Sequence, residues 1–578
     1  MQQIHALNAL DLPEIRVQIG SYLSFRDRKR CTLVCKDWHR DFQALVWELF
    51  PLFENPRADV MPHNVLAARQ ASIRKYAHLI KYVEGMSIFG DNPFARPFGL
   101  RFPLLNPLIE EHCRSLVTIK ATVCDASAWA ACMKLIQVNM RLREVDLTCT
   151  LPGGAPMVEV PLHKALVGHD RLVSLTLGCQ TTATALLQIL QACPSLRLLC
   201  VDGFLSPRSS PLSSADESSV DNDQDVEGSE DENDSSAQGE NEEEEEEEGE
   251  EKQQVDDPEE GLKEPLLLSS SPFQLQSLRI RKTCDDPAII QVLQHCPSLI
   301  SLTLLTTQRI SDALYKALEG NELDLPHLVK VYVNGRDPGN DSLEAFLKAF
   351  PRHQIRHVGL MNPTPMALQA LVECQHQSLE VLLVNNPQDP TSLAMVPERC
   401  AQLKELVVVT PHLMDARCLI DRPWVCQQLE TLLLPVGISK PNSTPRGPSE
   451  GGKEGSLTAE QVNELFFKQL GQLTRLRVLG LTRAEADTDD DDDDILSSEL
   501  SPLMWHVASG LRHLATLASL EEVHLGLGIW ELTEKDLQVM KECWPRLCAL
   551  SYNTLTINLW DTWFHIHWPG LKVECIVL

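Results

Sequence analysis

A chain of 578 residues, 43% hydrophobic but only 5% aromatic, is too long for one compact globule and can bury a large aliphatic core. The formal net charge of −30 comes from two segments. Residues 211–260 hold 24 acidic residues and one basic residue, and residues 484–494 hold eight acidic residues and no Lys or Arg. The remaining chain is close to neutral, so the charge does not indicate an acidic enzyme surface.

The 18 cysteines are scattered and form no C-x-x-C pair or short-range disulfide pattern. No apolar run approaches the ~18 residues that span a bilayer, and no basic stretch followed by an apolar one stands at the N-terminus. The sequence therefore predicts a soluble chain in the cytoplasm, the nucleus or both, with cysteines mostly as free thiols.

The first 50 residues predict three short helices. Pro13 suits a first helical turn, and Ile15, Ile19 and Leu23 recur every four residues as one apolar stripe. A basic turn and a second apolar run follow. So small a unit buries little area, so we expect it to need a partner for stability. Beyond it, we expect a helix near 64–78 and a cap strand over 79–83.

From residue 113 onward one pattern recurs: apolar-x-x-apolar-x-apolar. Most adjacent repeats begin 24 to 30 residues apart, at or just above the leucine-rich-repeat period. Segments between them look helical, for example 184–190, so strand and helix alternate. The repeats begin at Leu116, Leu142, Leu172, Leu196, Leu275, Leu299, Leu328, Ile355, Leu379, Leu403, Leu429, Leu476, Leu520 and Leu547.

Three longer gaps interrupt this pattern, and we expect each to be an inserted loop. They are an acidic insert at 204–271, a Pro/Gly/Ser loop at 437–457 and an acidic loop at 484–497. The first cannot bury enough apolar surface to fold, so it is predicted to be disordered. A lid over basic surface and a dock for a basic partner both stay open as its role.

One local pattern is specific in order and spacing. Leu12-Pro13-Glu14-Ile15 is followed by Ile19 and Leu23, then by Leu33-Val34-Cys35-Lys36-Asp37-Trp38, and finally by Trp47. It resembles the F-box, whose general form is LP-x-x-hydrophobic, then VCK-x-W, then a closing Trp. The family usually has an apolar residue where Arg28 stands, which leaves the local packing open. An ordinary three-helix cap is the alternative interpretation.

The resemblance implies that this segment binds the Skp adaptor, and through it a cullin–RING ubiquitin ligase. The residues that map onto adaptor-facing or core positions of the family are Leu12, Pro13, Ile15, Ile19, Leu23, Leu33, Val34, Cys35, Trp38 and Trp47. The expected fold class is α/β, with a three-helix F-box at 8–50, a linker helix and cap at 51–112, and a leucine-rich-repeat solenoid or horseshoe at 113–578 that carries the disordered acidic insertions.

Cysteine recurs three residues before the first leucine of a repeat, which resembles the cysteine-containing class of leucine-rich repeats. The cysteines are Cys113, Cys193, Cys296, Cys400 and Cys426. Equivalent positions of stacked repeats are strung along an axis, so packing is favoured over metal ligation. His565 and His567 lack an evident third ligand, and a terminal cap strand is the interpretation that we prefer for 563–568.

No catalytic motif, metal site or cofactor site is evident, so the chain is not expected to be an enzyme. The leading hypothesis is a substrate-recognition subunit of an SCF-type ubiquitin ligase, which binds a protein substrate on its repeats. The alternative is an acidic leucine-rich-repeat scaffold that shields basic proteins such as histones. Membrane or nucleic-acid partners are not expected.

Residues that alternate with the core leucines should face the inner side of the strands. There a basic patch adjoins an apolar stripe, which suits a substrate segment with apolar side chains beside acidic or phosphorylated ones. The predicted substrate-binding residues are Arg279, Arg281, Lys330, Tyr332, His357, Leu383, Val407, Val409 and Leu433.

Deletion of residues 208–265 should leave the melting temperature of the chain within a few degrees of the parent value. A structureless loop contributes little beyond closure entropy, which grows slowly with loop length. Thermal unfolding followed by circular dichroism measures this. Cooperative loss of folding on the deletion would show that the segment is part of the folded structure.

Overall fold

The computed structural model describes most of the chain outside the inserts. The described residues are 10, 12–51, 63–84, 108–110, 113–123, 126–149, 162–204, 272–283, 286–305, 312–320, 322–334, 341–439, 457–481, 500–527, 532–553, 563–564 and 566–575. The chain divides into one unit of 1–206 with 272–578 and a second of 207–271. Every element named below belongs to the first unit.

The predicted inserts fall almost entirely outside the described residues. Of the acidic insert 204–271 only Phe204 is described, and of the acidic loop 484–497 no residue is. The predicted loop 437–457 begins inside a strand, Val436–Ser439, and residues 440–456 lie outside the described part.

Three helices form near the N-terminus: α1 (Pro13–Tyr22), α2 (Phe25–Cys31) and α3 (Lys36–Glu48). Pro13 occupies the first turn of α1, where a missing N–H costs little. The Ser24 side chain caps α2 by accepting a hydrogen bond from the Asp27 N–H. Helices α1 and α2 both pack on α3.

A parallel sheet follows, with seventeen strands among the described residues. Each strand pairs in parallel with the next one in chain order. The strands are β1 (Leu49–Pro51), β2 (Tyr82–Glu84), β3 (Thr118–Val123), β4 (Glu144–Cys149), β5 (Ser174–Thr181), β6 (Leu198–Phe204), β7 (Ser277–Thr283), β8 (Ser301–Leu304), β9 (Lys330–Asn334), β10 (His357–Met361), β11 (Val381–Asn385), β12 (Glu405–Val409), β14 (Thr431–Leu433), β16 (Val478–Gly480), β18 (Glu522–Leu527), β19 (Ala549–Asn553) and β20 (Lys572–Cys575).

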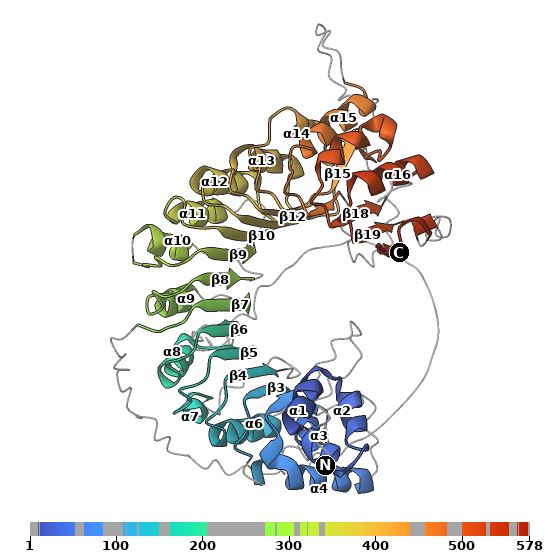
Figure 1. The fold of residues 1–578 in the computed structure, drawn as a ribbon. Helices are drawn as coiled ribbons and strands as arrows, with labels where there is room; N and C mark the ends of the chain where they lie inside the picture. The colour runs from blue at the N-terminus through green and yellow to red at the C-terminus, as the bar shows by residue number, and fades with distance from the viewer. Residues whose placement is uncertain are drawn as a thin grey trace, which may run out of the picture. The chain divides into compact units, whose positions relative to one another are not determined.

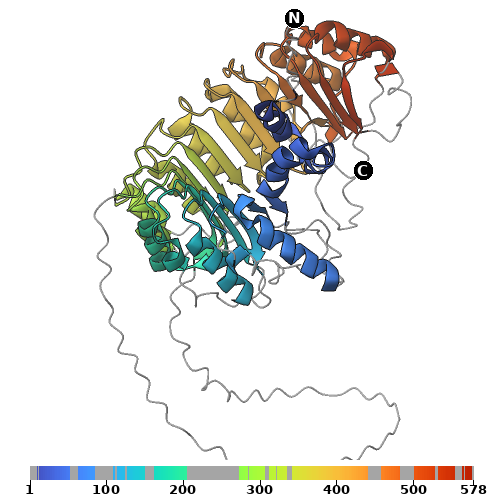
Figure 2. The same ribbon diagram turned by 60° about the horizontal axis from the view of Figure 1, so that its bottom comes forward.

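Helices between the strands lie along one face of this sheet (Figures 1 and 2). We call the other face the strand face. The helices are α4 (His63–Tyr76), α6 (Ala126–Val138), α7 (Leu162–Leu166), α8 (Ala183–Ala192), α9 (Asp286–Leu293), α10 (Asp312–Glu319), α11 (Asp341–Ala349), α12 (Pro365–Gln375), α13 (Met395–Arg399), α14 (Arg417–Ile420), α15 (Ala459–Leu470) and α16 (Glu534–Cys543). The mixed α/β class with a long parallel repeat sheet is therefore confirmed.

The sequence period did not predict a second, smaller sheet. Strands β13 (Met414–Asp415) and β15 (Val436–Ser439) are parallel, and β17 (Leu500–Pro502) pairs antiparallel with β15. The sequence also placed a strand at 563–568, which is wrong. Residues 563–564 and 566–567 are helical, the Trp568 N–H donates to the Phe564 carbonyl at 2.8 Å, and the last strand is β20.

The repeat leucines form the core. In β12, Leu406 and Val408 are buried against the helices, while Glu405 and Val409 are exposed on the strand face. The same alternation holds in β9, where Val331 and Val333 are fully buried. Since strand side chains alternate with period two, each repeat contributes one apolar edge to a continuous core.

The position three residues before each first leucine carries more than apolar packing. Several of its side chains lie against a carbonyl at the helix end of the preceding repeat. The contacts are Cys113 Sγ to Ala77 O at 3.1 Å, His169 Nε2 to Ile136 O at 2.9 Å, Cys193 Sγ to Leu166 O at 3.8 Å, and Trp544 Nε1 to Leu514 O at 3.0 Å. Each of these carbonyls also accepts the backbone N–H three residues on, so the side chain adds a second contact to a carbonyl at a helix end.

The five recurring cysteines are all buried. Burial raises the pKa of Cys193, Cys296, Cys400 and Cys426 to about 12, so they remain thiols. No group of three side chains that could hold a metal ion occurs in the described ranges. A separate finding is that none of the helices described is long and apolar enough to cross a membrane. The cysteines therefore pack in the core, as the repeat spacing predicts.

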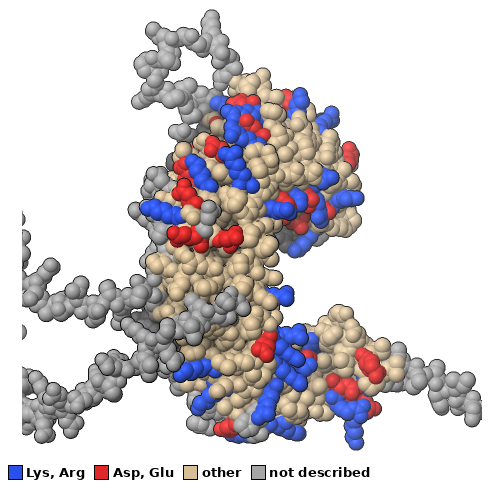
Figure 3. All heavy atoms as spheres, turned by 90° about the vertical axis from the view of Figure 1, so that its left-hand side faces the viewer, with Lys and Arg blue, Asp and Glu red and all other residues tan. Residues whose placement is uncertain are grey.

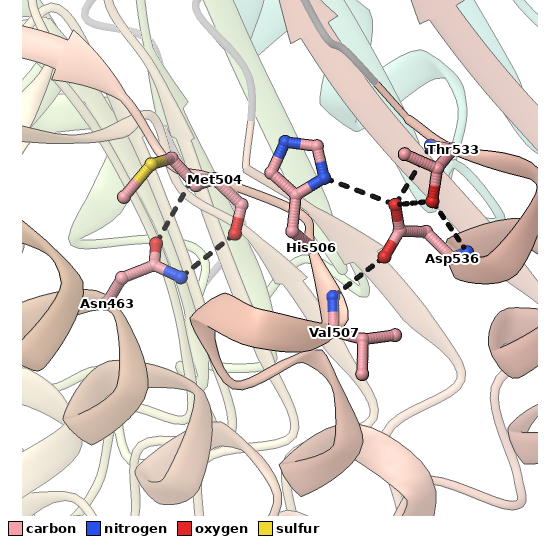
Figure 4. A network of polar contacts seen from close by, with 6 residues as sticks. All are labelled: Asn463, Met504, His506, Val507, Thr533 and Asp536. Carbon is pink, nitrogen blue, oxygen red and sulfur yellow. Dashed lines mark hydrogen bonds and ion pairs between the residues drawn. The ribbon is translucent and has the colours of Figure 1, made fainter.

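One buried amide, that of Asn463, and one buried carboxylate, that of Asp536, join elements of the C-terminal repeats by hydrogen bonds to the backbone (Figure 4). Asn463 of α15 accepts from the Met504 N–H and donates to the carbonyls of Met504 and Ser509. Asp536 of α16 accepts from the Val507 N–H at 2.7 Å and lies 3.1 Å from the His506 ring. Burial raises the pKa of Asp536, but the hydrogen bonds that it accepts outweigh burial, and the pKa is lowered overall.

Replacing Trp544 by Phe should lower the free energy of unfolding by about 1–3 kcal/mol, because it removes the indole N–H from the Leu514 carbonyl, which keeps only the Leu517 N–H, and leaves a void at a fully buried site. The matched control is Trp563→Phe, which removes an indole hydrogen bond to Glu534 at the surface and should change stability by less than ~0.5 kcal/mol. Urea unfolding of both variants tests this. Equal effects would show that the inter-repeat contact is not stabilising.

Candidate docking surfaces

The N-terminal helices leave large apolar side chains exposed. Leu33 and Val34, in the turn between α2 and α3, are 83% and 63% exposed, and Leu12, Ile15 and Val17 at the start of α1 are also exposed. We call these five residues the N-terminal apolar surface. Several exposed large apolar side chains in one small unit are a feature of interaction sites, whereas single exposed leucines are not.

The buried side of α1 differs from the stripe that its sequence predicts. Arg16 and Gly20 are the buried residues, whereas Ile15 is exposed and Ile19 and Leu23 are half-buried. A Cβ atom at position 20 would lie 2.3 Å from Leu45 Cδ1 and 3.0 Å from Phe42 Cε1, so any other residue would require these side chains or α1 to shift. The apolar stripe therefore lies at the border of the exposed surface.

A buried ion pair holds α1 against α3. The Arg16 guanidinium contacts the Asp41 carboxylate at 2.5 Å and donates to the Leu10 carbonyl at 2.8 Å. Burial raises the pKa of Asp41, but hydrogen bonds from Arg16 and Arg40 outweigh it and lower the pKa overall. Breaking such a pair leaves an uncompensated buried charge, so the pair fixes the orientation of α1.

The Arg28 side chain, which departs from the F-box pattern, binds backbone. Its guanidinium donates to the carbonyls of Leu23 at 3.0 Å, Ser21 at 3.1 Å and Leu45 at 3.4 Å. The first two are carbonyls at the end of α1, which need donors from outside the helix. Arg28 therefore joins the end of α1 to α3, and the question that the sequence left open is answered by polar contacts.

The ten predicted adaptor residues divide into two groups. Leu12, Pro13, Ile15, Leu33, Val34 and Cys35 are exposed, and Ile19, Leu23, Trp38 and Trp47 are partly buried. Trp38 stacks on Phe42 with ring centroids 5.1 Å apart, and Trp47 stacks on Tyr76 of α4 at 4.7 Å. Trp47 thus joins α3 to the start of the repeats, and its ring does not belong to the N-terminal apolar surface.

The predicted substrate-binding residues lie on the strand face, in three adjacent rows. The central row follows the strand pairing from β7 to β14 and consists of Arg279, Thr303, Tyr332, Gly359, Leu383, Val407 and Leu433. Lys330 and His357 are neighbours in a row two residues earlier along each strand. Arg281 and Val409 lie two residues later than the central row.

Two glycines that the sequence reasoning missed shape this central row. The Tyr332 ring covers Gly359, where a Cβ would lie 2.2 Å from Tyr332 Cδ1, and Leu433 covers Gly480, at 2.6 Å from its Cδ2. A glycine in the middle of a strand, flanked by core residues, is a signal of such close approach. Tyr332 and Leu433 therefore lean over the next strand, and since Leu383 and Val407 lie between them in the row, the four side chains follow one another as one continuous surface.

The charges on the strand face are arranged unevenly. Arg279, Arg281 and Lys330 have no ion pair within the described part of the chain, although Arg281 lies near Asp146 and lowers its burial-raised pKa. Burial, and then Lys330, lower the pKa of His357, which favours its neutral form. Glu405, which the prediction did not include, lies in the row of Lys330 and His357. The surplus of positive charge is thus confined to β7–β9.

The helix-bearing side shows no comparable separation. Charged residues of both signs are intermixed there, with an uncharged band between the upper and lower groups (Figure 3). Helices α8 and α9 contain no Lys, Arg or Glu. The strand face and the N-terminal apolar surface are therefore the better candidates for selective docking.

No protein-family model matches this chain, and no curated protein does. Among solved structures, a chain of the Rad7 and Elc1 complex in yeast is similar, with 12% identity and a TM-score of 0.36 over 99% of this chain and 98% of that chain. A likeness of this size carries no argument about function. The class of protein follows from the chain itself: a helical N-terminal unit joined to a solenoid-like α/β repeat sheet.

Replacing Gly20 by Val should displace α1 from α3, because the added side chain overlaps Leu45 and Phe42. Amide hydrogen exchange in residues 13–22 should become roughly tenfold faster or more. The control is Ser21→Val, which adds a branched side chain at the next, exposed position. Unchanged exchange in both variants would show that the close approach of α1 and α3 is not required.

Proposed function

We propose that this chain is the substrate-recognition subunit of an SCF (Skp–cullin–F-box) ubiquitin ligase. Helices α1 to α3 act as the F-box and bind the Skp adaptor through the N-terminal apolar surface. The strand face of the repeats holds the protein substrate. The observation that supports this most strongly is the exposure of Leu33 and Val34, which stand in the run that resembles the F-box VCK-x-W motif.

An uncovered apolar surface of this kind favours a permanent or high-occupancy partner. Burying apolar area is worth about 25 cal/mol per Å², so exposed Leu and Val side chains gain free energy when a partner covers them. The three N-terminal helices have a small core of their own, because among their described residues only Phe42, Arg16 and Gly20 are buried. A bound adaptor would therefore stabilise the helices as well as recruit the ligase.

In this proposal the chain itself catalyses nothing and needs no cofactor. It raises the local concentration of substrate lysines near the ubiquitin-conjugating enzyme, which another subunit carries. The two surfaces lie on different elements, the N-terminal helices and strands β7–β14. In this proposal the adaptor and the substrate therefore do not compete for the same residues.

The double variant Leu33→Asp with Val34→Asp should weaken binding to purified Skp adaptor by roughly 100-fold or more, because both central apolar contacts become charged. The control is Met366→Asp, which places the same charge on an exposed apolar residue of α12 and should leave adaptor binding unchanged. Calorimetry with the full chain measures both affinities.

Undiminished adaptor binding by the double variant, or by a chain that lacks residues 1–50, would refute the F-box assignment. A second pair, Leu12→Ala with Pro13→Ala, should also abolish binding while circular dichroism shows that the repeats remain folded. An acidic scaffold for basic proteins predicts no adaptor binding by the parent chain, so the same titration separates the two hypotheses.

A further inference from the structure

We infer that the strand face of β7–β14 binds one extended segment of a partner protein, which lies across the strands and carries a carboxylate or phosphate about seven residues from an apolar anchor. This deepens the proposed function by naming the class of substrate. It rests on that function only for the fate of the bound protein, because the segment would bind whether or not the adaptor does.

The positive end of this surface requires an anion. Arg279 and Arg281 of β7 and Lys330 of β9 are cationic side chains without an ion pair among the residues that the structure describes. Two acids lie nearby: Asp146, which is close to Arg281 and whose pKa burial raises, and Asp202 of β6, the strand next to β7. A carboxylate or phosphate placed over β7 would therefore gain charge-assisted hydrogen bonds that the chain itself does not supply.

The other end is apolar. Tyr332, Leu383, Val407 and Leu433 form the continuous surface of the central row and are all partly exposed, and Val409 beside them is 43% exposed. No described residue covers them completely. Apolar side chains of a partner would gain burial here, centred on Leu383 and Val407, which pair with one another across β11 and β12.

An extended backbone needs hydrogen-bond partners, and the strand face offers amides beside the row. Asn334 at the end of β9 is 6% exposed, and its Oδ1 has no hydrogen-bond partner among the described residues. Asn385 at the end of β11 is exposed. The pairing through Met361 places both in one row next to the apolar surface. An unpaired buried acceptor costs free energy until a donor reaches it.

The strand pairing sets the spacing between the two ends. Arg279 and Val407 lie five strands apart in the central row. Parallel strands are about 4.8 Å apart, so the span is roughly 24 Å, which an extended chain rising about 3.3 Å per residue crosses in about seven residues. A helical segment, rising about 1.5 Å per residue, would need about sixteen.

The test uses fluorescein-labelled peptides that join Asp-Asp to Leu-Val-Leu through Gly-Ser spacers of about three, about seven, about eleven and about sixteen residues. Each is made with Asp-Asp and with two phosphoserines, and fluorescence anisotropy measures binding to the full chain. We expect the peptide with about seven spacer residues to bind at least roughly tenfold more tightly than that with three. The two anionic series decide between carboxylate and phosphate.

Two variants locate the site. Arg279→Glu with Arg281→Glu should weaken anionic peptides by roughly tenfold or more, and have little effect on a peptide without acids. Val407→Asp should weaken all peptides that carry the apolar anchor. The control is Arg422→Glu, which reverses an exposed arginine paired with Glu398 on the helix-bearing side and should change nothing.

Affinity that does not depend on spacing, or that survives both variants, would overturn the inference, and so would an optimum near sixteen residues. Adaptor binding is measured on the same variants and should equal that of the parent chain. Peptide binding without adaptor binding would retain this site and reject the ligase role. Adaptor binding without any peptide binding would reject this site and leave the proposed function in place.

Discussion

Several neighbouring repeats are joined where a helix ends beneath the next strand, by side chains that contact the carbonyls there. Such a carbonyl accepts one backbone N–H from three residues on, as Ala77 does from Ile80 and Leu514 from Leu517, and a second hydrogen bond contributes about 0.5–1.5 kcal/mol. In this chain the side chain three residues before the next first leucine often reaches them, as Cys113 and Trp544 do for Ala77 and Leu514. This contact joins neighbouring repeats at these positions and adds to the burial of the repeat leucines.

This constraint explains why the position tolerates different residue types. Cys, His and Trp differ in volume, but each can present a donor to a carbonyl of the preceding repeat. Gln375, four residues before Leu379, makes a related contact with its amide, donating to the Pro351 carbonyl and accepting from the Ile355 N–H. The side chains at core and turn positions are thus used for contacts within the fold. The side chains left for contacts with other proteins are those on the strand face and on the helices that no repeat covers.

The period of the leucines was sufficient to predict the parallel sheet and the side of each strand that faces the core, because both follow from side-chain alternation. It did not predict β1, β20 or the small sheet of β13, β15 and β17, whose strands are short and lack the full pattern. The apolar stripe of α1 was also misleading. A buried arginine and a glycine, Arg16 and Gly20, face α3, and only tertiary contacts with Asp41 and Leu45 explain them.

For the strand face, the sequence identified which residues point outward but not how they combine. Register decides that Lys330 and His357 adjoin each other, and that Glu405 interrupts the basic character of their row. The effect of Gly359, which lets Tyr332 lean over β10, also requires the pairing to be known. Charge compensation between Arg281 and Asp146, which are far apart in sequence, has no local sequence signal at all.

A further charge pattern distinguishes the later strands from the earlier ones. The residue just before the strand alternates in sign from β10 to β18: Arg356, Glu380, Lys404, Glu430, Arg477 and Glu521. Glu380 contacts both of its neighbours, Lys404 at 2.6 Å and Arg356 at 3.5 Å, and Arg477 contacts Glu521 at 2.6 Å.

Such a ladder satisfies its own charges along one edge of the sheet. An anionic partner that approached there would meet paired carboxylates as well as cations, and exposed pairs of this kind contribute only ~0–1 kcal/mol each. On β5–β9 the equivalent position is mostly uncharged, with Val173, Gln276, Ile300 and Val329, so no ladder competes for Arg279, Arg281 and Lys330. The sheet edge thus carries paired charges beside the later strands, whereas beside β7–β9 it carries none that could pair with the cations of the strand face.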